Sequence, residues 1–217
     1  MAKQQIKLAL GWIVIVGWLF WLWGSINPTP PFDPAQHVAL GQVVAEESLK
    51  LLGPGGRFIL ILRDAGTFQS PATDVHKRTF LKTVTAAKAQ VASTLSVKVD
   101  PLRVPAVPPG DLLRILKEAK DGDVIVSFAG PPVFSEAQMG KLGGKFPKMV
   151  AVCTGAIPKQ VDLGSILKRG VLSLAILDRE GAAKPIQAIR DERGLFDRYY
   201  QLATPSTWAL VTEGKAL

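Results

Sequence analysis

Apolar residues dominate the amino-terminal part of the chain. The run from Leu8 to Trp23 contains no charged residue, and the basic residues Lys3 and Lys7 precede it. Its length approaches the roughly 20 residues that a helix needs to cross about 30 Å of hydrocarbon. The pattern predicts a transmembrane helix at residues 8–26. The positive-inside rule then predicts a cytoplasmic amino terminus, with the rest of the chain beyond the membrane.

Bulky side chains at the end of this run favour an anchor that stays in the membrane over a cleaved signal peptide. A cleavage site needs small residues, whereas Trp21 and Trp23 stand there. An indole suits the membrane interface because its ring can be buried while its N–H stays hydrated. We therefore expect a single-pass inner (plasma) membrane protein with its main domain periplasmic or otherwise extracytoplasmic. The predicted membrane-interface residues are Lys3, Lys7, Trp12, Trp18, Trp21 and Trp23.

Prolines and glycines divide the next part of the chain. The prolines within residues 27–34 predict a stiff, extended spacer. A helix is predicted from Pro34, with Asp33 as its N-cap, to a stop at Gly53. The expected division is a cytoplasmic tip and anchor at 1–26, a spacer at 27–34, a juxtamembrane helix and turn at 35–56, an α/β domain at 57–181 and a carboxyl-terminal extension at 182–217.

Short apolar runs alternate with helical patterns after residue 57. Strands separated by helices indicate βαβ units, and uninterrupted apolar runs are typical of strands covered on both faces. The right-handed crossover rule then favours an α/β fold with one doubly wound, mostly parallel, Rossmann-like sheet in the order 2-1-3-4-5. The predicted strands are 58–62, 95–99, 124–128, 149–153 and 171–177, and the predicted helices are 73–92, 111–120, 135–142 and 162–168.

The carboxyl-terminal extension is less regular. Its apolar stretches at 186–189 and 208–211 are interpreted as edge strands, and 197–202 as a helical turn.

The order of elements resembles one lobe of a type I periplasmic binding protein, the two-lobed receptor for sugars and amino acids. The residues that carry the resemblance are FILILRD (58–64), DLLRILKEAKDGDVIVSFAGPP (111–132) and KRGVLSLAILDR (168–179). The resemblance covers about residues 57–179. It implies two lobes that close around a ligand, whereas this chain has length for one. We expect either that another chain supplies the second lobe or that the lobe has lost its ligand and serves as an interaction module.

The carboxyl ends of the strands offer a candidate site, because ligands of open α/β sheets bind there, where the strand order reverses. The resemblance implies an aromatic platform after the first strand and a polar contact after the fifth, which correspond to Phe68 and Asp178. In an alternative interpretation, Asp64 and Asp178 pair with neighbouring arginines or with a helix N-terminus. The candidate ligand-binding residues are Asp64, Thr67, Phe68, Ser127, Thr154, Asp178 and Arg179.

Familiar catalytic and metal-binding motifs do not occur in the sequence. It has no C-x-x-C, H-E-x-x-H, G-x-S-x-G or Walker pattern, and two histidines with one cysteine are few zinc ligands. We interpret His37 and His76 as solvated side chains and Cys153 as a small core residue. The sequence therefore predicts no metal, no cofactor and no enzymatic activity.

These features favour a non-enzymatic accessory or scaffold subunit of a membrane protein complex. It would contact the bilayer through residues 8–26 and protein partners through its α/β domain. The formal net charge of +8 leaves attraction to anionic partners open, while the predicted compartment excludes nucleic acid. The alternative is a membrane-tethered solute-binding or sensor domain for a small-molecule ligand. An envelope enzyme of unrecognised chemistry is a third hypothesis.

Overall fold

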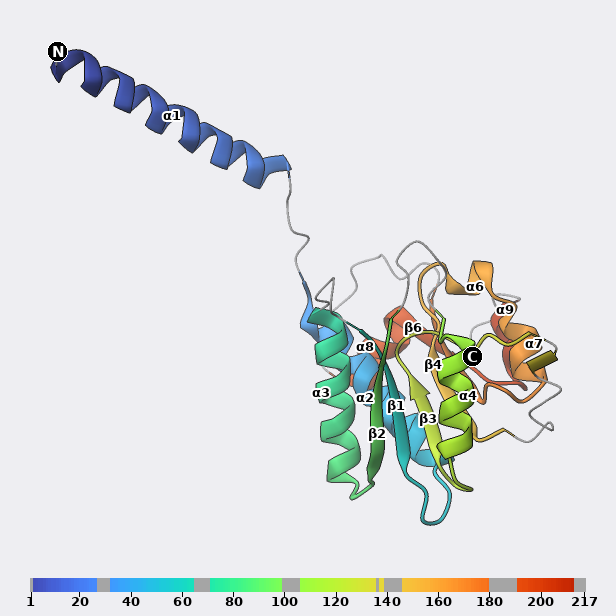
Figure 1. Cartoon of the computed structure of the whole chain (residues 1–217). Coiled ribbons are helices and arrows are strands. Elements are labelled where there is room, and N and C mark those ends of the chain that lie inside the picture. The colour runs from blue at the N-terminus through green and yellow to red at the C-terminus, as the bar shows by residue number, and fades with distance from the viewer. Residues whose placement is uncertain are drawn as a thin grey trace. The chain divides into compact units, whose positions relative to one another are not determined.

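A computed structural model describes residues 2–26, 32–64, 71–98, 106–135, 137–138, 146–179 and 191–212. The chain forms two compact units, Met1–Asp33 and Pro34–Leu217. The first contains helix α1 (Ala2–Ile26), and the second contains the α/β domain (Figure 1).

Helix α1 covers the apolar run that was predicted to cross a membrane. Its side chains Trp12, Trp18 and Trp21 are exposed to 64%, 62% and 66%. The side chains of Lys3, Lys7 and Trp23 lie outside those described. Among the described residues, no helix combines the length and the apolar character that crossing a membrane requires. The predicted localisation, a single-pass membrane protein, is therefore wrong.

The α/β domain is built on a six-stranded sheet with the order β2-β1-β3-β4-β5-β6. Strands β1 to β5 pair in parallel, and β6 pairs antiparallel with β5. The predicted mostly parallel sheet is confirmed, and β6 extends the predicted order at one edge. The strands are β1 (Phe58–Arg63), β2 (Val91–Val97), β3 (Val124–Ser127), β4 (Lys148–Val152), β5 (Leu174–Asp178) and β6 (Tyr200–Ala203).

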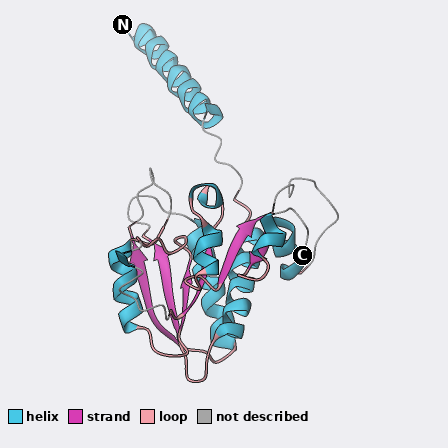
Figure 2. Cartoon of the chain, turned by 90° about the vertical axis from the view of Figure 1, so that its right-hand side faces the viewer, coloured by secondary structure: helices cyan, strands magenta, loops and turns pink. Residues whose placement is uncertain are grey.

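Helices cover both faces of this sheet (Figures 1 and 2). Alternate side chains of a strand point to opposite faces, so the uninterrupted apolar run of β1 supplies both cores. Phe58 and Leu60 face one core, while Ile59 and Ile61 face the other. The first core is covered by α2 (Pro34–Leu51), α3 (Pro71–Ala86) and α8 (Glu192–Tyr199), and the second by α4 (Pro109–Glu118), α6 (Ile157–Gln160), α7 (Leu163–Lys168) and α9 (Trp208–Thr212).

Asp123 joins two loops at the amino ends of β1 and β3. Its carboxylate accepts hydrogen bonds from the backbone N–H groups of Arg57 (2.8 Å) and Lys120 (2.9 Å). Burial opposes its ionisation, but these bonds and the Arg57 guanidinium outweigh burial and lower the pKa of Asp123. The two loops touch so closely that a Cβ added at Gly56 would overlap the carbonyl group of Gly122.

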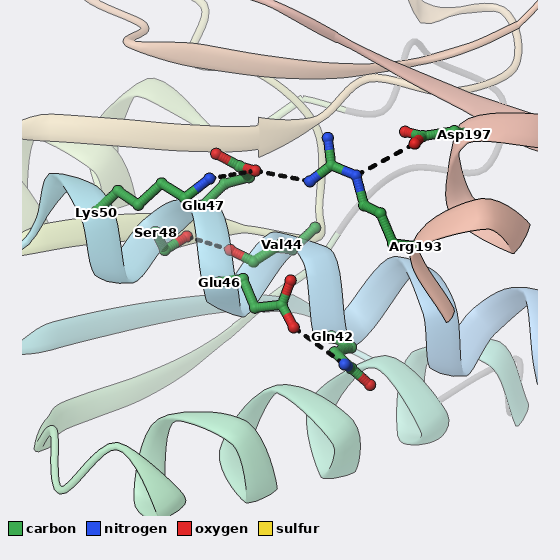
Figure 3. A network of polar contacts seen from close by, with 8 residues as sticks. All are labelled: Gln42, Val44, Glu46, Glu47, Ser48, Lys50, Arg193 and Asp197. Carbon is green, nitrogen blue, oxygen red and sulfur yellow. Dashed lines mark hydrogen bonds and ion pairs between the residues drawn. The ribbon is translucent and has the colours of Figure 1, made fainter. Parts of the chain in front are cut away.

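A polar network ties α8 to α2 (Figure 3). Oε1 of Glu47 accepts hydrogen bonds from Nζ of Lys50 (2.8 Å) and from the Arg193 guanidinium (2.9 Å). The same guanidinium lies 3.3 Å from Asp197 on its own helix. Burial opposes the ionisation of Glu47, but the two cations outweigh it and lower its pKa. The segment that leads to β6 is therefore fixed to the first helix of the domain.

Several predicted elements differ from the observed ones. The helix predicted at 73–92 ends at Ala86, because Lys88 adopts a left-handed conformation with a φ of 59° and turns the chain into β2. The stretch 208–211, predicted as an edge strand, is helix α9, and the turn predicted at 197–202 is the end of α8 followed by β6. The predicted elements at 135–142 and 186–189 lie largely or wholly outside the described residues. The proposed domain boundaries stay a prediction.

Candidate functional site

Asp178 is an exposed polar residue at the carboxyl edge of the sheet. It is the last residue of β5. Its Oδ2 accepts a hydrogen bond from the N–H of Gly155, in the loop after β4, at 2.5 Å. No further side-chain hydrogen bond of Asp178 is found among the described residues. One carboxylate oxygen is thus held in place, while the other can accept a hydrogen bond from a ligand.

Three other candidates border the same edge. Asp64 follows β1, is half-buried and donates its backbone N–H to Val97. Thr154 is the second residue after β4, and its side chain is half-buried. Arg179 follows β5 and is half-buried, and its Nε donates to the carbonyl oxygen of Tyr200 on β6 at 3.5 Å. The structure therefore brings Thr154, Asp178 and Arg179 together at the carboxyl ends of two neighbouring strands, β4 and β5.

Ser127, in contrast, is occupied within the fold. Its side chain is fully buried at the end of β3. The hydroxyl donates to the carbonyl oxygen of Gly130 (2.7 Å) and accepts from the N–H of Ala129 (3.2 Å). A ligand could reach it only if this turn opened, so Ser127 has the least support among the described candidates. The remaining two, Thr67 and Phe68, lie outside the described residues.

A cluster of two histidines and a phenylalanine, which no sequence pattern indicated, also lies at this edge. Nδ1 of His37 lies 3.0 Å from Nε2 of His76, and the ring of His76 stacks on Phe128 at 5.5 Å. Phe128 directly follows β3, and its N–H donates to Ile61 of β1. The cluster therefore lies where β1 and β3 meet, which is the point of strand-order reversal.

Both histidines were interpreted from the sequence as solvated side chains, and this was wrong. Each is half-buried, and the two form a hydrogen bond across the contact of α2 with α3. Burial, followed by the positive charge that His37 can carry, lowers the pKa of His76 to about 4. His76 is therefore neutral at physiological pH.

Tyr200 connects the start of α2 to the same edge. It begins β6, lies opposite Asp178 in the ladder, and its hydroxyl accepts a 2.7 Å hydrogen bond from Nε2 of Gln36. Burial, against the effect of this hydrogen bond, raises the pKa of Tyr200 to about 12. Tyr200 is therefore a neutral phenol. Its hydroxyl joins α2 to β6, and its backbone pairs with Asp178 of β5.

The cysteine has the environment predicted for it. Cys153 is fully buried, and burial raises the pKa of its thiol. Within the described ranges, no three His, Cys, Asp or Glu side chains are grouped so that they could hold a metal ion.

Comparison with known proteins identifies the fold. No protein-family model matches the chain, and no curated protein matches it. A periplasmic ribose ABC transporter structure from Conexibacter woesei DSM 14684 aligns with 82% of this chain and 60% of its own, at 14% identity and a TM-score of 0.51. The periplasmic component of an ABC-type sugar transport system from Hahella chejuensis aligns with 83% of this chain and 57% of its own, at 18% identity and a TM-score of 0.45.

The chain thus spans about three fifths of the ribose transporter chain that it matches. At this identity the match shows the fold and nothing further. The resemblance predicted from the order of strands and helices is confirmed: the α/β domain has the fold of one lobe of a type I periplasmic binding protein.

Proposed function

We propose that the α/β domain is a solute-binding lobe with its site at the carboxyl edge of the sheet, and that it catalyses no reaction. The observation that carries this proposal is the geometry of Asp178, an exposed carboxylate fixed through one oxygen by Gly155. A carboxylate held in this way is a strong acceptor for hydroxyl groups. Thr154, next to Gly155, adds a hydroxyl that can both donate and accept.

The fold supports the same proposal. The ribose ABC transporter from Conexibacter woesei shares it, and sugars present several hydroxyl donors to such an edge. We therefore propose a small, hydroxyl-rich solute of monosaccharide size as the ligand class. The accessory-subunit role that the sequence favoured has less support, because no described feature identifies a membrane or a membrane protein partner.

An open edge encloses a ligand on one side only. A site that leaves the ligand partly hydrated gains little from burial, so we expect a dissociation constant of about 1 mM for the lobe alone. A second lobe that closed over the ligand would raise the affinity.

The proposal is tested by thermal unfolding of the full chain with D-ribose, D-arabinose and D-tagatose, each at about 50 times the expected dissociation constant. At this excess, binding should stabilise the native state by about 2 kcal/mol. Asp178→Asn keeps an oxygen for the Gly155 N–H but loses the charge, and it should lose most of the stabilisation. Glu118→Gln, at the exposed end of α4, is the matched control and should respond like the wild type.

The proposal fails if none of the three sugars raises the unfolding temperature. It also fails if Asp178→Asn responds as fully as Glu118→Gln, because the carboxylate would then take no part in binding.

A further inference from the structure

The two edges of the sheet differ in how they are protected against pairing with another strand. β6 is an edge of four residues, Tyr200–Ala203, and short edge strands pair poorly. β2, at the other edge, has seven residues, Val91–Val97, without a charged residue or a proline (Figure 1). Charges and prolines are the usual protection of edge strands, so β2 is the unprotected edge.

The register of β2 shows which backbone groups are open. The carbonyl oxygen of Val97 accepts a hydrogen bond from the Asp64 N–H at 2.8 Å, so Val97 faces β1. Backbone groups alternate in direction along a strand, and Leu95 therefore also faces β1, while Thr94 and Ser96 face outward. Among the described residues, no hydrogen bond to these outward groups is found.

The register shift at the start of β2 limits the regular part of this edge. Phe58 of β1 pairs with Val91, but the next residue, Ile59, pairs with Ser93, so one residue of β2 is skipped. The pairing is regular from Ser93 to Val97. This stretch is centred on Leu95. Its side chains form two sets: Ser93, Leu95 and Val97 lie on the face of the second core, and the exposed Thr94 and Ser96 on the other.

We propose that two copies of this chain associate antiparallel through β2, about a two-fold axis at Leu95. In this register Thr94 of one copy lies opposite Ser96 of the other, and the outward backbone groups of both exchange hydrogen bonds. Leu95 lies opposite its own copy in a non-hydrogen-bonded pair, where side chains approach most closely.

The side chains of this register are compatible with self-pairing. Leu95 is half-buried against the second core, and the Leu95 of the second copy completes its burial. Hydroxyl groups meet hydroxyl groups at Thr94 and Ser96, a favourable cross-strand combination. No like charges are opposed within the strand, because residues 91–97 carry none. The net charge of +8 per chain opposes association in general, so added salt should strengthen the dimer.

Cross-linking tests the register directly. In Leu95→Cys the two new thiols lie in a pair with Cα atoms about 4.5 Å apart, within the disulfide range of about 4.4–6.8 Å. In the matched variant Ser93→Cys the two thiols are offset by about 13 Å along the strands. Mild oxidation should therefore convert Leu95→Cys to a covalent dimer, while Ser93→Cys should form no covalent dimer. The buried native Cys153 does not interfere.

Sedimentation of the full chain tests the edge without a new thiol. Thr94→Lys should weaken dimerisation by at least about tenfold, since it places two like charges diagonally across the two-fold axis, on the same face of the paired strands. Thr85→Lys makes the same change at an exposed position of α3 and should leave the dimer unchanged. Thr94→Pro removes an outward N–H without removing a bond to β1, and it should also prevent association.

Equal cross-linking of the two cysteine variants, or no cross-linking of Leu95→Cys, overturns the proposal. The exposed apolar side chains of α1 could also drive association. In that case Leu95→Cys and Ser93→Cys would cross-link to the same extent, and Thr94→Lys and Thr85→Lys would dimerise equally. These experiments use no solute, so their outcome is independent of the proposed binding function.

Discussion

Nδ1 of His37, on α2, lies 3.0 Å from Nε2 of His76, on α3. The two helices also approach closely one turn further along α2, where a Cβ added at Gly41 would lie 3.0 Å from the carbonyl oxygen of His76. A neutral imidazole has one donor and one acceptor nitrogen, so the pair is satisfied while at least one ring is neutral. The contact between α2 and α3 therefore depends on the protonation of His76.

We expect the stability of the domain to fall on acidification because of His76. Its pKa is about 4 in the folded chain and 6.5 when unperturbed, so the unfolded state binds the proton more readily. The contribution of neutral His76 to the free energy of unfolding is complete above pH 6.5 and is lost progressively towards pH 4. It amounts to about 3 kcal/mol, measured as the free energy of unfolding in urea at several pH values.

The variant His76→Gln provides the control for this prediction. Its amide can still bond to His37 but does not titrate. The stability that this variant loses between pH 6.5 and 4 should therefore be smaller than the wild type's loss, by most of the about 3 kcal/mol assigned to His76. An unchanged pH profile in His76→Gln would show that other groups cause the acid sensitivity.

The bond between Glu47 and Arg193 should contribute measurably to the attachment of α8. Glu47 is only 13% exposed, whereas Arg193 is 48% exposed, so solvent screens the pair in part. We expect Glu47→Gln to cost about 1 kcal/mol of unfolding free energy. Glu46→Gln is the neighbouring control, because Glu46 bonds only to Gln42 of its own helix in Figure 3. Equal losses in the two variants would contradict a role for the contact between helices.

Gly56 should tolerate no side chain. An added Cβ would overlap the Gly122 carbonyl group, which belongs to the backbone, and the Cβ itself is fixed by the backbone, so neither can rotate away. We expect Gly56→Ala to cost about 3 kcal/mol. Gly110→Ala, in α4 with no atom within 4 Å of the new Cβ, should stay within about 1 kcal/mol of the wild type. Similar unfolding midpoints for the two variants would contradict the close approach of the loops.

The Cys153 thiol should be unreactive in the native protein. It is fully buried, and burial raises its pKa, so little thiolate forms and reagents cannot reach it. A thiol reagent such as dithionitrobenzoate should react only at the rate at which the domain unfolds, and rapidly in denaturing urea. Fast labelling of the native chain would mean that the second core opens locally.

The central strands could be predicted from the sequence because they are continuous apolar runs. Val124–Ser127 is buried throughout, Lys148–Val152 is buried after its first residue, and such runs leave little choice of structure. The end of α3 was misplaced because no glycine or proline marks it, and Lys88 supplies the left-handed turn instead. The stretch Trp208–Thr212 was misassigned because short apolar runs fit a strand and a helix equally. The hydrogen-bonded hydroxyl groups of Thr204 and Thr207, just before it, mark a helix start instead.

The candidate site was predictable only in part. The position of Asp178 follows from the end of its strand, whereas its bond to Gly155 depends on a loop that no local pattern specifies. The pairing of His37 with His76 arises from two helices that are separated along the chain, so local sequence contains no signal for it. Ser127 looked accessible because it ends a strand, but the following turn occupies its hydroxyl.

The most direct test of solute binding at the carboxyl edge is a titration of the ¹⁵N-labelled full chain with D-ribose, followed by amide chemical shifts. The proposal predicts saturable shifts at Thr154, Gly155 and Asp178, with a dissociation constant of about 1 mM. Arg57 and Asp123, at the amino ends of the strands, should not shift. Shifts that do not saturate, or that appear at the amino ends and not at Asp178, would contradict the proposed site.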